Sequence, residues 1–96
     1  MLKIPTRFKI RVNADNIERV LDTLKWNGYT WISGRKLELR GDFQYTTVGL
    51  CIDHHRVARY SSDVDYLACS FNEMPISQLF ASAKTADVSE DILSLF

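Results

Sequence analysis

Two adjoining segments near the amino terminus place the strongest constraint on the fold of this chain. Residues 7–12, RFKIRV, alternate strictly between basic and apolar side chains, which is the period-two pattern of a half-buried strand. In residues 13–28, NADNIERVLDTLKWNG, apolar side chains recur at helical spacing and share one face: Ile17, Val20, Leu21 and Leu24. The sequence therefore predicts a strand that is followed at once by a helix packed against its apolar face.

The two ends of this predicted helix carry their own signals. Asp15 followed by Glu18 is typical of a capping box, and Asn13 is an alternative cap. Gly28 is expected to end the helix, because glycine readily adopts the left-handed conformation that follows a helix.

The rest of the chain favours strands. Those expected are residues 29–33 and 36–40, joined by a turn at Gly34 and Arg35, then residues 47–53, 57–61 and 65–71. Leu37 and Leu39 are expected to point inward, and residues 41–46 are interpreted as a loop or an irregular strand. Pro75 and Ser77 favour a short helix. Ser89 is expected to cap a final turn or two that buries Ile92, Leu93 and Phe96.

This order of elements predicts an α+β fold. We expect a small antiparallel sheet of about four to five strands, with the amphipathic helix on one face and short helical segments near the carboxyl end. The 96 residues favour a single domain over 1–96, with 1–6 and 84–96 at its periphery.

No apolar run approaches the roughly 18 residues of a membrane span, and the first ten residues lack the apolar core of a signal peptide. We therefore expect a cytoplasmic protein that does not enter a membrane. In that compartment Cys51 and Cys69 are expected to be free, buried and unreactive thiols, and nothing in their spacing suggests a disulfide.

The stretch LCIDHHRVARY, residues 50–60, places Asp53, His54 and His55 between two apolar runs. Asp-His-His opens a signature of phosphoesterases, so the segment is either a small metal-dependent phosphoesterase site or a turn between two strands. The chain has only two histidines, whereas a two-metal site needs about four to eight protein ligands. Neighbouring side chains on an extended segment also point to opposite sides. We expect a hairpin with the histidines at its tip.

Other catalytic signatures are absent from the sequence. It contains no Gly-x-Ser-x-Gly elbow, no Walker loop and no Gly-x-Gly-x-x-Gly. It also lacks the His-x-x-x-His or Cys-x-x-Cys spacing that would complete a zinc site. We therefore expect a protein without enzymatic activity, without catalytic or metal-binding residues and without a cofactor.

The chain has no net charge, but its charges are divided unevenly. Residues 1–59 hold eleven Lys and Arg against six Asp and Glu, and residues 60–96 hold one Lys against six Asp and Glu. Either the two parts neutralise each other within the fold, or a basic surface faces an anionic partner.

The candidate binding surface combines basic side chains with aromatic ones. It consists of Arg7, Lys9, Arg11, Trp26, Trp31 and Arg40. The first three share the polar face of the first strand, and Trp26 falls opposite the apolar stripe of the helix. Such a surface suits an anionic ligand or nucleic acid, through phosphate contacts and base stacking. The alternative is structural: the rings fill a second small core, covered by the stems of Arg and Lys.

The order of these motifs resembles small uncharacterised accessory proteins of tailed bacteriophages. A strand FKIRV and a helix lead into GYTW at 28–31, and a later hairpin runs into RYSSDVDYLA, so the resemblance covers residues 7–80. It implies an anti-defence or other accessory role in the cytoplasm of an infected host cell, and no particular activity. On that basis the leading hypothesis is a non-enzymatic binding module, which blocks a host protein or sequesters an anionic small molecule such as a nucleotide signal. Nucleic-acid binding through the basic sheet face is the alternative, and either function is compatible with a homodimer.

Overall fold

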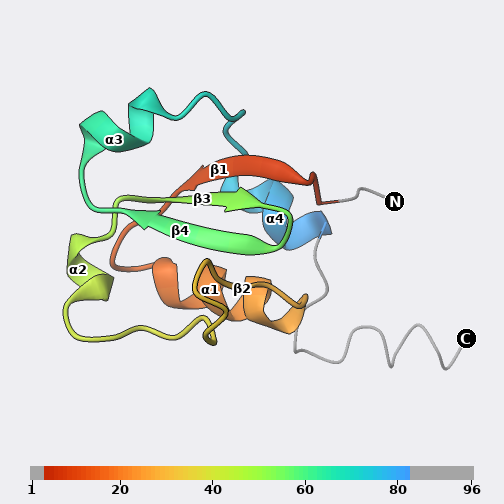
Figure 1. Cartoon of the computed structure of the whole chain (residues 1–96), viewed down its shortest axis with the longest axis horizontal. Coiled ribbons are helices and arrows are strands. Elements are labelled where there is room, and N and C mark those ends of the chain that lie inside the picture. The colour runs from red at the N-terminus through yellow and green to blue at the C-terminus, as the bar shows by residue number, and fades with distance from the viewer. Residues whose placement is uncertain (1–3, 83–96) are drawn as a thin grey trace, which may run out of the picture.

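The computed structural model describes residues 4–82, and its centre is a four-stranded sheet with strand order β1-β3-β4-β2 (Figure 1). The strands are β1 (Arg7–Arg11), β2 (Thr30–Trp31), β3 (Gly49–Asp53) and β4 (Arg56–Tyr60). The helices are α1 (Ile17–Trp26), α2 (Phe43–Thr46), α3 (Asp63–Ala68) and α4 (Ile76–Ser82). The protein is therefore a small α+β fold, as the sequence predicted.

The sheet is mixed. β1 and β4 both pair antiparallel with β3, whereas the short β2 pairs in parallel with Arg56 and Val57 of β4. The outer edge of β1 is covered by the segment 72–74, where the N–H of Lys9 donates to the carbonyl of Asn72 at 2.9 Å. The carbonyl of Lys9 accepts from the N–H of Met74 at 2.8 Å. This edge is therefore protected from pairing with another chain.

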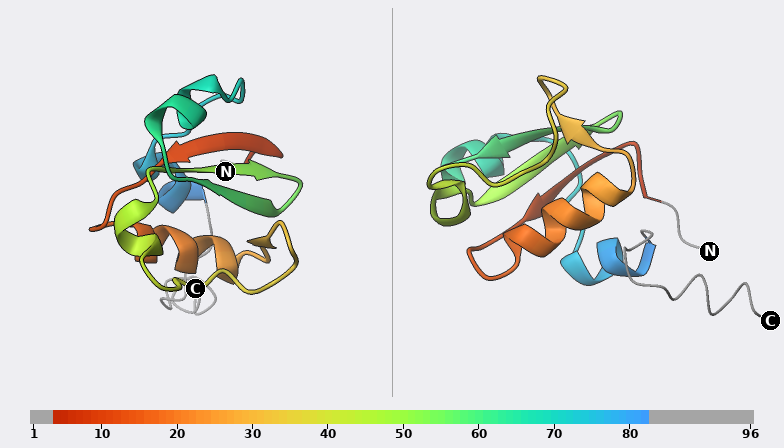
Figure 2. Two further views of the ribbon diagram at one scale, coloured as in Figure 1. Left: turned by 60° about the vertical axis from the view of Figure 1, so that its left-hand side comes forward. Right: turned by 90° about the horizontal axis from the view of Figure 1, so that it is seen from below.

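One face of the sheet carries the hydrophobic core. Phe8 and Ile10 of β1 alternate inward as predicted, and all four predicted apolar residues of α1 are buried against the sheet. Figure 2 shows α4 beside α1 on this side, where the guanidinium of Arg19 stacks over the Phe80 ring at 4.2 Å. Leu79 of α4 completes the same core. We call this side of the sheet the inner face.

The ends of α1 decide between the two predicted caps. The side-chain oxygen of Asn13 accepts from the backbone N–H of Asp15 at 2.8 Å and of Asn16 at 3.1 Å. Asn13 therefore closes the turn that leads into α1, whose N-cap residue Asn16 makes no side-chain capping bond, and the capping-box prediction for Asp15 is wrong. Gly28 follows the helix with φ of 90°, which confirms its role as the stop.

The opposite side of the sheet, which we call the outer face, is covered by α3. The hydroxyl of Ser62 caps this helix by accepting from the N–H of Asp65 at 3.2 Å. Tyr66 is its one buried residue, and the ring lies directly on Gly49. A Cβ added at Gly49 would lie 2.1 Å from the Cδ1 atom of that ring. The absence of a side chain at Gly49 is therefore what lets α3 approach the sheet.

Three segments differ from their predicted structure. Leu37 is buried and Leu39 packs against the core, so their inward direction is confirmed, but residues 36–40 pair with no described strand. Residues 43–46 form a single helical turn, and the expected strand 65–71 is largely α3. Alternation of apolar residues reports which side is buried; it does not report whether a hydrogen-bonding neighbour exists.

The carboxyl-terminal predictions have mixed outcomes. The short helix expected near Pro75 and Ser77 is α4, which begins at Ile76. The final turns expected at Ser89, with Ile92, Leu93 and Phe96, lie outside the described residues. Within residues 4–82, none of the helices is both long enough and apolar enough to cross a membrane.

Candidate ligand-binding site

His54 and His55 form the tip of the β3–β4 hairpin, as the sequence predicted. Both have positive φ, 51° and 68°, which is the signature of a two-residue type I′ turn. The N–H of His54 donates to the carbonyl of Thr6 at 3.0 Å, and the carbonyl of His55 accepts from Thr30 at 3.1 Å. The His55 ring also stacks on Tyr29, with centroids 4.4 Å apart. Both histidines therefore have structural contacts that hold the hairpin tip to its neighbours.

Asp53 lies beside this tip and connects it to β1. Its carboxylate accepts hydrogen bonds from the His54 ring and from Nε of Arg7, the latter at 3.1 Å. The bond from His54 lowers the pKa of Asp53 most, partial desolvation opposes it, and Arg7 lowers it further. Within residues 4–82, no group of three or more His, Cys, Asp or Glu side chains is placed to hold a metal ion.

The three basic residues on the polar face of β1, which we call the basic stripe, are Arg7, Lys9 and Arg11. They project from the outer face of the sheet, and each has an intramolecular partner. Arg7 pairs with Asp53, and Arg11 pairs with Asp63 of α3. The ammonium of Lys9 donates to the backbone carbonyls of Tyr66 at 3.0 Å and Cys69 at 3.1 Å. Of these contacts, only the Arg11–Asp63 pair joins the basic and acidic parts of the sequence, as internal neutralisation between those parts requires.

Trp26 lies at the end of α1 and is 58% exposed. The outward direction predicted from the helical spacing is confirmed. Trp26 does not line the same pocket as Trp31 and Arg40, so the structure separates the six predicted binding residues into three places.

Trp31 and Arg40 do come together, at a pocket of about 390 Å³ that we call the basic-aromatic pocket. Its lining comprises Trp31, Ile32, Ser33, Arg35, Arg40, Phe43, Val57, Ala58 and Arg59. The pocket exists because β2 pairs only with Arg56 and Val57. The remainder of β4 has no strand on that side among the described residues, and Ala58 and Arg59 from this part of the strand line the pocket.

Two aromatic rings build the apolar walls of the basic-aromatic pocket. Trp31 and Phe43 meet edge to face, with centroids 6.0 Å apart and an interplanar angle of 80°, which is a preferred aromatic geometry. The guanidinium of Arg59 lies over the Phe43 ring, 4.0 Å from its centroid. Arg59 also donates to the hydroxyls of Thr46 at 3.3 Å and Thr47 at 3.1 Å. Arg59 is thus fixed in place by neutral groups that leave its charge uncompensated.

The charge of this pocket is entirely positive. Arg35, Arg40 and Arg59 line it, and none of its lining residues is acidic. In the described part of the chain, no carboxylate forms an ion pair with any of these three arginines. Three guanidinium groups at one apolar hollow, without an internal counter-ion, favour an anionic ligand.

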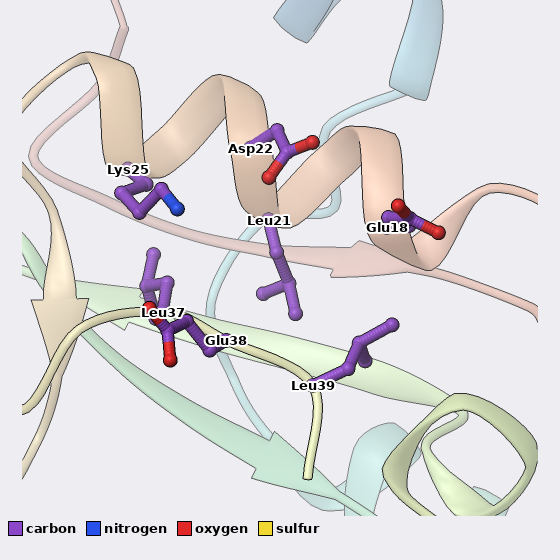
Figure 3. A pocket seen from close by; sticks show the side chains of 7 residues that line it. All are labelled: Glu18, Leu21, Asp22, Lys25, Leu37, Glu38 and Leu39. Carbon is purple, nitrogen blue, oxygen red and sulfur yellow. The ribbon is translucent and has the colours of Figure 1, made fainter.

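A second hollow shows that a positive lining is not general to this protein. It measures about 230 Å³ and lies between α1 and the segment 36–40 (Figure 3). Leu21, Leu37 and Leu39 point into it, and its polar residues are Glu18, Asp22, Lys25 and Glu38. This hollow is mainly acidic and therefore suits no anion.

Trp31 and Arg40 were predicted from the sequence to be binding residues, but on the same surface as the basic stripe. Phe43 and Arg59 were not assigned to a site, and Arg35 was interpreted only as a turn residue. The available signal was the density of Arg and aromatic residues between 31 and 43. What it could not supply was the parallel pairing of β2 with β4, which brings Arg59 to the same place.

Comparisons of the chain with protein-family models, with curated protein sequences and with solved structures found no match.

Proposed function

We propose that this protein is a non-enzymatic binding module that captures an anionic ligand with a planar ring system in the basic-aromatic pocket. The observation that carries the proposal is the lining of that pocket, which has three arginines, two aromatic rings and no carboxylate. A nucleotide is the ligand class that combines the two required features, a charged phosphate and a flat base.

The electrostatics of the pocket support a phosphate group. An Arg guanidinium binds phosphate through paired N–H donors, and Arg35 and Arg40 have no internal ion pair in the described residues. Binding an anion there would relieve the mutual repulsion of three like charges. The same group on the basic stripe would compete with Asp53 and Asp63, which already pair with Arg7 and Arg11.

The size and apolar walls of the pocket support a planar group. A volume of about 390 Å³ lies within the usual range of about 300–1,000 Å³ for small-molecule sites. Trp31 supplies an indole face or edge, and stacking of a base on such a ring contributes about 1–3 kcal/mol. We therefore assign phosphate recognition to the arginines and base recognition to Trp31.

The resemblance to phage accessory proteins supplies the biological setting of the proposal. In that setting the module acts in the host-cell cytoplasm by sequestering a nucleotide signal, which is an anti-defence role. Capture of the intact ligand needs no chemical step, and the pocket lining offers binding groups without a general base next to a nucleophile.

Tryptophan fluorescence provides a direct test, because Trp26 and Trp31 are the only two tryptophans of the chain. In the variant W26F, Trp31 becomes the single reporter, and titration with AMP, ATP and cyclic dinucleotides should change its emission saturably. The matched variant W31F keeps only Trp26, and its emission should stay constant. Reversing the pocket charges in W26F with R35E and R40E should weaken binding at least about tenfold.

Two further probes separate the rival ligands. A single-stranded oligonucleotide should bind more weakly than a mononucleotide in this pocket; tighter binding with a steep salt dependence would point to nucleic acid instead. If no nucleotide changes Trp31 emission and isothermal calorimetry detects no heat of binding, the proposal is wrong.

A further inference from the structure

The two cysteines of the chain, expected to be buried and unreactive, lie next to each other on the outer face of the sheet. Cys51 is the central residue of β3, and Cys69 directly follows α3. Their Sγ atoms are 3.8 Å apart, and both side chains are only partly buried. The fold therefore brings together two thiols whose separation in the sequence gave no sign of a pair.

The two thiols have different surroundings. Burial raises the pKa of the Cys51 thiol above its ordinary value. Burial also opposes ionisation of Cys69, but hydrogen bonds from the Phe71 backbone and from the Tyr60 and Cys51 side chains outweigh it. The nearby Lys9 ammonium acts in the same direction, and the pKa of Cys69 is lowered. Lys9 is held at this position because it donates to the Cys69 carbonyl at 3.1 Å. Cys69 thus has the surroundings of an attacking thiolate, and Cys51 those of a neighbouring thiol.

The short approach needed for a disulfide is compatible with the packing of α3. Bonding requires the sulfur atoms to close from 3.8 Å to about 2.0 Å. α3 spans six residues, with Tyr66 as its one buried anchor and with Val64 and Leu67 exposed. The end of such a helix can move by this amount without breaking the core.

A small oxidant also has a route to the pair. Cys51 lines a hollow of about 380 Å³ on the outer face, together with Ala58 and Phe71 and with Asp53, His54 and Arg56 from the hairpin tip. The exposed Ile32, which follows β2, completes its lining, and none of the lining residues belongs to the buried core. The hollow gives a molecule as small as a peroxide access to Cys51. Cys69 does not line the hollow, but its side chain is itself only partly buried, and its sulfur lies 3.8 Å from that of Cys51.

We propose that Cys69 is a modification site for hydrogen peroxide and related two-electron oxidants, with Cys51 as the resolving thiol. The Cys69 thiolate attacks one peroxide oxygen, the O–O bond breaks, hydroxide leaves, and Cys69 becomes a sulfenic acid. The sulfur of Cys51 then attacks the Cys69 sulfur, the S–O bond breaks, and water leaves as the disulfide forms. The two sulfurs together lose two electrons, and the peroxide is reduced to two waters after protonation of the hydroxide.

The disulfide would fasten the end of α3 to β3, across the connection formed by β4. In the reduced protein, the described side-chain contacts that hold α3 to the sheet are non-covalent ones, made by Tyr66, Lys9 and the Arg11–Asp63 pair. Oxidation would therefore add a covalent link, reversible by thiols, that holds α3 over Lys9 and Arg11. This inference does not rest on the proposed ligand, because the two thiols lie outside the basic-aromatic pocket.

The test uses the full reduced chain with hydrogen peroxide, followed by alkylation and intact-mass analysis. The wild type should lose the mass of two hydrogen atoms and become resistant to alkylation, while it stays monomeric on a non-reducing gel. In C51S, Cys69 should accumulate as a sulfenic acid that reacts with dimedone. In C69S, the remaining Cys51 should react at least about tenfold more slowly.

Circular dichroism of both serine variants checks that the fold is retained, which serine should permit because it is close in size to cysteine. A dithiol that survives peroxide without an internal bond, or disulfides formed only between chains, would overturn the proposal. Equal dimedone labelling of C51S and C69S would likewise overturn the assignment of Cys69 as the reactive thiol.

Discussion

The two faces of the sheet are held by different kinds of interaction. On the inner face, aliphatic side chains from β1, β3, α1 and α4 are almost completely buried in one cluster. On the outer face, one tyrosine, two cations of β1 and two thiols connect α3 and its end to the strands. Stability should therefore depend mainly on the inner face, while the outer face and the adjacent pocket are free to serve chemistry and binding.

The largest expected effect belongs to the inner face. Leu21 lies in the centre of the apolar stripe of α1 and is 2% exposed, so Leu21→Ala should lower the free energy of unfolding by about 2–5 kcal/mol. Urea denaturation of the two proteins measures this difference. The control Val64→Ala removes an equally apolar but exposed side chain of α3 and should change stability by less than about 0.5 kcal/mol. Similar losses in both variants would mean that the two faces contribute alike.

A smaller effect is expected where α3 meets the outer face. Gly49→Ala places a Cβ against the Tyr66 ring, and such overpacking costs about 1–3 kcal/mol. Since the helix is short, it should shift away from the sheet while the inner core stays intact. Hydrogen exchange should then increase in residues 62–69 and not in α1.

A double-mutant cycle isolates this contact. In the background of Tyr66→Ala, the substitution Gly49→Ala should cost much less, because the ring that it meets is gone. If Gly49→Ala costs the same in both backgrounds, its effect comes from the backbone of β3 and not from the docking of α3.

The inner face is the part of the fold that the sequence predicted well. Alternation in β1 and helical spacing in α1 both follow from burial on a single side, which is a local property of the sequence. The outer face was predicted poorly because its contacts are individual and distant. The Tyr66–Gly49 contact joins residues 17 positions apart in the chain. The local sequence indicates only where α3 begins, through the capping residue Ser62 and the acidic residues Asp63 and Asp65 of the first turn.

The same reasoning explains what was predicted of the candidate site. Trp31 and Arg40 were named because basic and aromatic residues are dense in that stretch. Their separation from Arg7, Lys9 and Arg11 depends on the sheet order, which places β2 at the opposite edge from β1. A single sequence contains no signal for the parallel pairing of a two-residue strand.

The third prediction compares the two groups of basic residues at equal change of charge. Arg7→Glu with Arg11→Glu should lower the melting temperature by a few degrees, since it opposes Asp53 and Asp63 with like charges across exposed pairs. Arg35→Glu with Arg40→Glu should leave stability within about 0.5 kcal/mol and weaken nucleotide binding at least about tenfold. Melting and nucleotide titration on the same samples measure both properties. Loss of binding in the stripe variant without loss of stability would move the ligand site to β1.

The smallest expected effect is the pH dependence contributed by Asp53. Hydrogen bonds from His54 and Arg7 lower the pKa of this carboxylate in the folded protein below the ordinary value of 3.8. A carboxylate with a lowered folded pKa stabilises the protein above its unfolded pKa, and that contribution disappears as the pH falls through the folded pKa. Asp53→Asn should therefore melt at a lower temperature than the wild type near neutral pH, and the two melting temperatures should converge well below the ordinary pKa of the carboxyl group.

The variant His54→Ala serves as the control, because it removes the largest cause of the lowered pKa. In that background, the difference in melting temperature caused by Asp53→Asn should change less with pH. A constant difference between the wild type and the Asp53→Asn variant at every pH would show that the ion pairs of Asp53 contribute nothing to folding. The backbone hydrogen bonds to Thr6 and Thr30 and the contact of His55 with Tyr29 would then hold the tip.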